Sequence, residues 1–175
     1  MWNSAEIKIE CTRAMNEDLI ARHNRLVQPN DLVYHLGDFA FAESRDVAKF
    51  ISRMNGNFRF IWGNHDAGLK ELKFNLSHYP DLKDRVEFLG DLAEGNIEGH
   101  KIILCHYAML RWNNSHFGSY HLFGHSHNTL PDDPNSLSFD VGVDCNNYEP
   151  FSLEQVVARM ANKTFKPIDQ HGHRS

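Results

Sequence analysis

The sequence predicts a single α/β domain whose strands end in polar side chains. Its 175 residues fit one domain, and no internal repeat or Gly/Ser-rich linker divides them. In the first half, segments with helical periodicity alternate with short apolar runs, as expected of strands joined by helices that cover a sheet. In the second half, short apolar runs are separated by Gly, Asn and Pro, which indicates a sheet with brief loops.

Two helices are expected in the first half. Over residues 13–27 the apolar side chains recur on one helical face, and the pattern stops before Pro29, which cannot continue a helix. The same spacing returns over 43–54 and ends at Asn55-Gly56, a pair suited to a left-handed C-cap. A strand is expected after each helix: 32–36 and 58–62.

The second half is expected to hold several strands and a final helix. Ser152 and Gln155 stand at the spacing of a capping box, so the helix should begin there. From Lys163 onward the tail is polar, and we expect it to be irregular. The apolar runs expected to be strands are 86–89, 101–104, 120–123 and 137–143.

Composition excludes several classes of protein. The formal charge of -5 gives no basic surface, so there is no strong signal for nucleic acid. Three scattered cysteines without a CxxC pair suggest neither a disulfide framework nor a zinc knuckle, and they fit a reducing compartment. No apolar stretch approaches the ~20 residues of a membrane span, and no signal peptide is visible. We therefore expect a soluble, cytoplasmic protein.

Four apolar runs each end in residues able to bind metal. Ligands gather at the carboxyl ends of strands in open α/β sheets, so these residues should lie close together. Carboxylate, amide oxygen and imidazole without thiolate favour Mn, Fe, Zn or Ni. Each motif alone has a structural explanation, as a turn or a packed histidine, but their combination at strand ends favours a metal site. The motifs are Gly37-Asp38, Gly63-Asn64-His65-Asp66, His106 and Gly124-His125-Ser126-His127. His35 and His121, inside the runs, are expected to be packing residues.

These motifs resemble those of the calcineurin-like metallophosphoesterases, in particular the small single-domain members of bacteria and phages. Cys105, Tyr107 and the segment 140–144 extend the resemblance. It implies a four-layer α-β-β-α sandwich of two mixed sheets flanked by helices, with a two-metal site. For this chain we expect one or two divalent ions. The roles that it implies are a bridging ligand for Asp38, second-site ligands for Asn64, His106 and His125, a first-site ligand for His127, and a proton donor for His65. Imidazole suits that donor role near pH 7, although His65 has a structural alternative in bracing the Asn64 loop.

The chain departs from the family pattern at its beginning. Family members open with a strand that ends in Asp-x-His and supplies two ligands of the first metal, and residues 1–13 contain no such motif. A ligand-free strand over Ala5 to Glu10 would fill the place of that strand in the sheet. Candidate substitute ligands are Asp169 with His171, and Glu10, Cys11 and His23. A start codon placed too late, or a natural truncation, is the simpler explanation.

Two functions are expected from these residues. The first is a metal-dependent phosphoesterase that hydrolyses a phosphomonoester, phosphodiester or nucleotide with a metal-activated water. The alternative is a catalytically impaired pseudoenzyme that uses the fold as a protein-binding scaffold, as a retromer subunit with this fold does. Arg111 and Trp112 would line the mouth of the site, contacting a phosphate and a base, or form an exposed loop with a packing tryptophan. The sequence does not give the oligomeric state, but a missing central strand would favour a homodimer that buries the gap.

Overall fold

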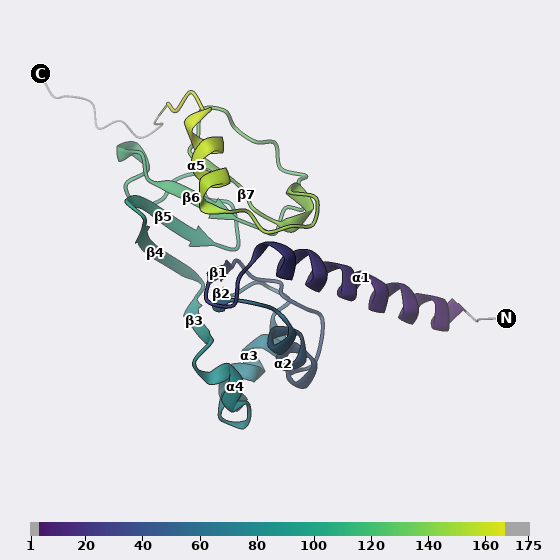
Figure 1. The fold of residues 1–175 in the computed structure, drawn as a ribbon. Helices are drawn as coiled ribbons and strands as arrows, with labels where there is room; N and C mark the ends of the chain where they lie inside the picture. The colour runs from purple at the N-terminus through teal and green to yellow at the C-terminus, as the bar shows by residue number, and fades with distance from the viewer. Residues whose placement is uncertain (1–3, 167–175) are drawn as a thin grey trace, which may run out of the picture.

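Two sheets lie between helices in the computed structural model, which describes residues 4–166 and their side chains from residue 10 onward. A three-stranded sheet has the order β1-β2-β3, and a four-stranded sheet has the order β4-β5-β6-β7. Figure 1 shows α2, α3 and α4 on the outer side of the first sheet and α5 on the outer side of the second. The predicted arrangement of two sheets flanked by helices is therefore confirmed.

The first sheet is parallel throughout. Its strands are β1 (Leu32–His35), β2 (Asn57–Ile61) and β3 (Val86–Gly90). The crossovers between them contain α2 (Ser44–Arg53), then α3 (Ala67–Asn75), the 3₁₀ turn Leu76–His78 and α4 (Pro80–Lys83). Phe58 and Phe60 of β2 are fully buried against apolar side chains of these helices, including Ile51 and Leu72. Burial of this face fixes the helices on the sheet.

The second sheet is mixed. Its strands are β4 (Leu92–Ile97), β5 (His100–Cys105), β6 (Tyr120–Phe123) and β7 (Ser138–Asp140), and only β4 is antiparallel to its neighbour. Leu104, Leu122 and Phe139 stand side by side in register. They belong to a core that also includes Leu36 and Ile61 from the segments of the first sheet. This shared core holds the two sheets together.

The final helix, α5 (Leu153–Ala161), begins as predicted. The side chain of Ser152 accepts a hydrogen bond from the N–H of Gln155, and the side chain of Gln155 accepts one from the N–H of Ser152. This reciprocal capping box satisfies two of the backbone donors left free at a helix start. Val156 and Met160 then pack against the core shared by the sheets.

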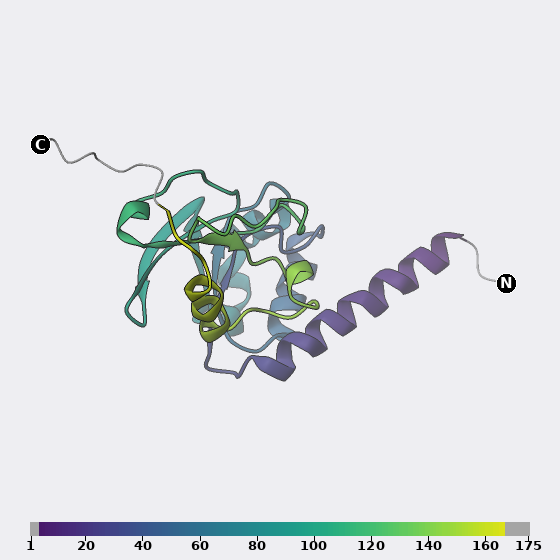
Figure 2. The same ribbon diagram turned by 90° about the horizontal axis from the view of Figure 1, so that it is seen from above.

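The first element, α1 (Ser4–Leu26), corrects one expectation. The segment Ala5 to Glu10 is helical and does not form a strand. The whole helix lacks Gly and Pro, and Arg22 bonds to Asp18 one turn earlier at 2.7 Å, so nothing interrupts the helix before residue 27. Figure 2 shows its amino-terminal part projecting away from the sheets. From residue 10 onward, where side chains are described, the buried residues of α1 are Ile20 and His23 in its last turns.

Two further findings concern the described residues 4–166. No strand precedes β1 there, and β1 lies at the edge of its sheet. No helix in this range is both long and apolar enough to cross a membrane.

Candidate metal centre

Four of the predicted site residues converge where the strands end. Asp38 follows β1, Asn64 follows β2, and His106 and His125 follow β5 and β6. His106 Nε2 lies 3.0 Å from Asn64 Oδ1, 3.2 Å from His125 Nδ1 and 3.4 Å from Asp38 Oδ2. The ligand atoms of Asp38, His106 and His125 all lie within 4.8 Å of one another. This four-residue cluster has the size of a coordination sphere for one ion.

The tautomer of His106 follows from its surroundings. The ring is 1% exposed, and its Nδ1 lies 2.7 Å from the carbonyl oxygen of Leu36, which can only accept a hydrogen bond. Nδ1 therefore carries the hydrogen, and in the neutral ring Nε2 presents a lone pair to the cluster. Asn64 Oδ1 likewise accepts a hydrogen bond from the Tyr107 hydroxyl at 3.2 Å. Lone pairs of several residues thus face one point, which is the arrangement that a cation fits.

Two glycines allow the loops after β1 and β2 to touch. Gly37 has a φ of +93°, and a Cβ there would lie 2.4 Å from the backbone nitrogen of Gly63. A Cβ on Gly63 would lie 2.2 Å from Asp38 Oδ1. A side chain at Gly63 would displace the Asp38 carboxylate, and one at Gly37 would collide with the backbone of Gly63 and the ring of His106, so the glycine of each motif has a steric role.

Asp66 connects these two loops, and sequence reasoning gave it no role. Its side chain is fully buried and accepts three backbone hydrogen bonds. Asp66 Oδ2 accepts from the N–H of Gly63 at 2.7 Å and of Asp38 at 2.9 Å, and Oδ1 accepts from the N–H of Phe39 at 2.8 Å. Asp38 itself has a left-handed φ of 54°. The buried carboxylate therefore stabilises the backbone conformation from which Asp38 reaches the cluster.

His65 lies beside the cluster but outside it. Its backbone N–H donates to Asp38 Oδ1 at 2.8 Å, and its ring packs against Phe41 with 4.6 Å between ring centroids. Both residues are exposed. The imidazole is therefore accessible to a ligand bound at the cluster, and its role as proton donor stays a prediction.

His127 is not brought into the cluster. Its Nδ1 lies 2.5 Å from Asp144 Oδ2, and its side chain is 73% exposed. The hydrogen bond to Asp144 raises the pKa of His127 above its usual value. His125 and His127 both have positive φ, and the N–H of Ser126 bonds to the carbonyl of Gly124 at 2.7 Å. This backbone departs from the extended geometry in which side chains two residues apart project to the same side.

The proposed substitutes for the missing ligands do not reach the cluster among the described residues. His23 is buried, bonds through Nε2 to the carbonyl of Asn55 at 2.8 Å and stacks on Phe58. Glu10 and Cys11 are exposed near the projecting end of α1. The candidates in the tail, Asp169 and His171, lie outside the described residues.

The two histidines inside the strands are packing residues, as predicted. His121 is fully buried, and its ring nitrogens bond to the carbonyl of Ile103 and the N–H of Met109. His35 packs against Phe39 and Phe60. Burial lowers the pKa of His35 to about 4, so this ring is neutral at pH 7.

Three comparisons relate the chain to known proteins. The family model described as the calcineurin-like phosphoesterase superfamily domain matches residues 14–139. The chain is similar to an uncharacterized protein of Methanocaldococcus jannaschii, with 29% identity over 172 residues, which cover 89% of this chain and 84% of that protein. It also resembles the crystal structure of a protein of unknown function from Aquifex aeolicus, with a TM-score of 0.56 and 18% identity over 82% of this chain and 83% of the other. The structural likeness concerns the fold alone.

Proposed function

The chain belongs to the calcineurin-like phosphoesterase superfamily, and on that premise we propose that it is a metal-dependent phosphoesterase. The reaction is hydrolysis of a phosphomonoester, phosphodiester or nucleotide by a metal-activated water. The supporting observation is the cluster of Asp38, Asn64, His106 and His125, in which His106 Nε2 lies 3.0–3.4 Å from one possible ligand atom of each of the other three residues. One cation could bind all four side chains.

The donor set favours a particular kind of ion. One carboxylate, one amide oxygen and two imidazoles suit Mn, Fe, Zn or Ni, because no thiolate is present. When bound, such an ion polarises a phosphoryl oxygen and lowers the pKa of a water molecule. The hydrogen bond from His106 Nδ1 to the carbonyl oxygen of Leu36 fixes the tautomer of the neutral ring, with the lone pair on Nε2, and holds the ring in place.

His65 is the proposed acid for the leaving oxygen. It follows the ligand Asn64 directly, and its exposed ring is held at the edge of the cluster by Phe41 and by its backbone bond to Asp38. Imidazole can donate a proton near pH 7, which makes departure of an alkoxide easier.

One observation favours a second candidate, a scaffold with impaired catalysis. His127 bonds to Asp144, and residues 4–166 contain no Asp-x-His strand before β1. The described residues therefore assemble ligands for one ion, whereas family members use two. A pure scaffold would, however, have no physical need for the four clustered ligands.

Metal stoichiometry followed by hydrolysis distinguishes the candidates. The purified chain is loaded with Mn²⁺, freed of unbound ion and measured by elemental mass spectrometry, then assayed with p-nitrophenyl phosphate and bis(p-nitrophenyl) phosphate. At least one ion per chain together with Mn²⁺-dependent release of nitrophenol supports the phosphoesterase. Bound ion without turnover of either ester, or no bound ion, supports the scaffold.

A further inference from the structure

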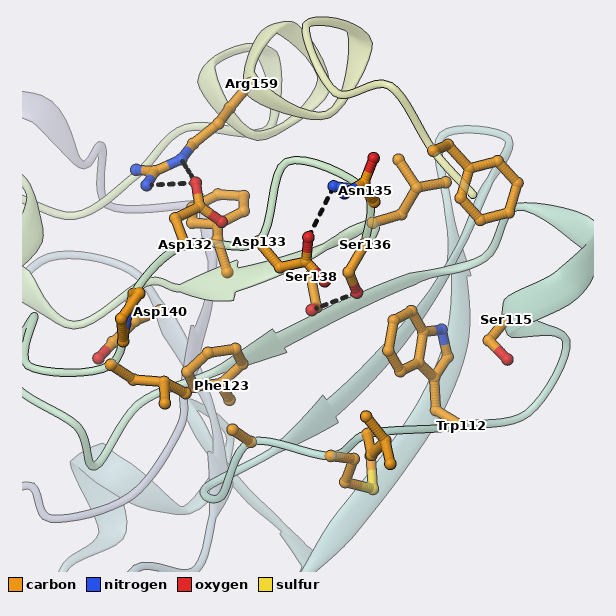
Figure 3. Close-up of a pocket in the computed structure, with 18 of the residues that line it drawn as sticks. Trp112, Ser115, Phe123, Asp132, Asp133, Asn135, Ser136, Ser138, Asp140 and Arg159 are labelled. Carbon is orange, nitrogen blue, oxygen red and sulfur yellow. Dashed lines mark hydrogen bonds and ion pairs between the residues drawn. The ribbon is translucent and has the colours of Figure 1, made fainter. Parts of the chain in front are cut away.

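We propose that a cavity beside the metal centre binds the nucleoside part of the substrate; this inference rests on the proposed function. The cavity has a volume of about 380 Å³ and lies between the segments 108–115 and 128–140 and helix α5 (Figure 3). This volume falls at the small end of the range for small-molecule sites and is too small for a folded partner.

Two of the segments that line the cavity directly follow the loops that carry the ligands. Ala108 and Met109 line it and follow Tyr107, while Asn128 lines it and follows His127. Consecutive Cα atoms are 3.8 Å apart, so the Cα of Ala108 is no more than about 8 Å from that of His106. An ester with its phosphoryl group at the metal centre can therefore place its organic group in the cavity.

One wall of the cavity is apolar and includes an aromatic ring. The indole N–H of Trp112 already donates to the carbonyl and hydroxyl oxygens of Ser119, so the ring offers a ligand mainly its apolar surface. Leu110 and Leu130, which also line the cavity, are 80% and 46% exposed. A flat, uncharged ring system would cover these side chains and stack on the indole.

The charges of the cavity disfavour a phosphate and favour a ligand that donates hydrogen bonds. The cavity is lined by three carboxylates and two cations. They are Asp132, Asp133 and Asp140, with Arg159 and Lys166. Arg159 is already paired with Asp132 at 2.9 Å, and Lys163, behind the wall, is paired with the same carboxylate. Figure 3 shows the Asp132–Arg159 pair at one side of the cavity.

Acceptor atoms of the cavity match the donors of a nucleoside. Asp133 accepts a hydrogen bond from the N–H of Asn135, and Asp140 accepts from the N–H of Gly142 at 2.8 Å and of Asn128 at 3.4 Å. An ionised carboxylate can accept about four hydrogen bonds, so both retain capacity for ligand hydroxyls and ring N–H groups. The paired hydroxyls of Ser136 and Ser138 add further acceptors, 2.9 Å apart.

Thymidine, a nucleoside without a phosphate, tests whether the cavity binds a nucleoside independently of the metal centre. Its binding to the full chain is measured by isothermal titration calorimetry, with and without Mn²⁺. We expect binding in both cases, because thymidine has no phosphate. Ser136→Phe, which fills the cavity, should weaken it at least tenfold, whereas the same change at the exposed Ser52 on α2 should not. Leu130→Glu is the second cavity variant, and thermal unfolding checks that each variant is folded.

A second experiment tests whether binding in the cavity promotes hydrolysis. It compares two esters that share the p-nitrophenol leaving group. The ratio of kcat/KM between the p-nitrophenyl ester of thymidine 5′-phosphate and p-nitrophenyl methyl phosphate should exceed tenfold and should fall towards one in Ser136→Phe. Failure of thymidine to bind a chain that hydrolyses the methyl ester overturns the cavity proposal and leaves the phosphoesterase standing. Thymidine binding without turnover of either ester supports the cavity and counts against the phosphoesterase.

Discussion

The carboxylate of Asp66 accepts the backbone N–H of Asp38 at 2.9 Å, across 28 residues of sequence. The same carboxylate also holds the N–H of Gly63, which precedes the ligand Asn64. One buried side chain therefore sets the geometry of two ligand loops. We infer that Asp66 is a positioning residue that contacts neither the metal nor the substrate.

Asp66→Asn should lower both stability and metal affinity. The amide NH₂ of asparagine would face backbone N–H groups that need an acceptor, so buried donors lose their partners. We expect a loss of about 1–3 kcal/mol in the free energy of unfolding and a roughly tenfold loss in Mn²⁺ affinity. Urea unfolding and Mn²⁺ titration measure the two effects.

A matched control for that change is Asp91→Asn, at an exposed position between β3 and β4. This change should alter neither the free energy of unfolding nor the Mn²⁺ affinity. Equal urea midpoints and equal Mn²⁺ affinities for Asp66→Asn and the unaltered chain would show that the carboxylate has no positioning role.

Gly63→Ala should be destabilising although the substitution is small. The added Cβ would lie 2.2 Å from Asp38 Oδ1, so either the carboxylate or the backbone must move. Overpacking of this kind costs about 1–3 kcal/mol. Gly95→Ala in β4 is the control, because a Cβ there meets nothing within 4 Å and its φ is not left-handed. Thermal unfolding should separate the two variants by several degrees, and equal melting temperatures would contradict the steric argument.

His125→Ala should abolish metal-dependent hydrolysis. His125 supplies one of the two imidazole nitrogens of the cluster, at 3.2 Å from His106 Nε2. Its loss leaves three clustered ligands, and we expect Mn²⁺ binding to weaken at least tenfold. His78→Ala, at an exposed histidine after α3, is the control and should behave as the unaltered chain. Unchanged hydrolysis in His125→Ala would overturn the site assignment.

The sequence was sufficient to predict the elements that carry the cluster. Buried runs such as those of β1 and β2 are continuous and apolar, and their ligands follow directly. The edge strand β4 was missed because most of its residues are exposed and show no alternation. Helix α3 was missed because its buried face, Leu69 and Leu72, is set among lysines and carries only a weak periodic signal.

Within the site, the features that the sequence did not predict depend on contacts between distant residues or on backbone conformation. The part played by Asp66 depends on N–H groups 27 and 28 residues away, which no local pattern encodes. The separation of His127 from the cluster depends on left-handed residues at 125 and 127, which a rule for extended strands cannot anticipate. The predicted helix over 13–27 likewise gave no sign that α1 continues back to Ser4.

The buried histidines should make the chain less stable in mild acid. Burial lowers the pKa of His35 to about 4, and it also lowers the pKa values of His23 and His121. In the unfolded chain these rings bind protons near pH 6.5, so the unfolded state binds more protons between pH 6.5 and 4. Stability is therefore fully present above pH 6.5 and falls as the pH is lowered towards 4.

His35→Leu should remove the largest part of that dependence. The Nδ1 of His35 is buried without a hydrogen-bond partner among the described residues, so replacing the ring removes no bond there. A pKa of about 4 corresponds to about 3 kcal/mol that is lost between pH 6.5 and 4. Urea unfolding at pH 7 and pH 5 should show a smaller difference in His35→Leu than in the unaltered chain. An equal difference in both would assign the acid sensitivity to other groups.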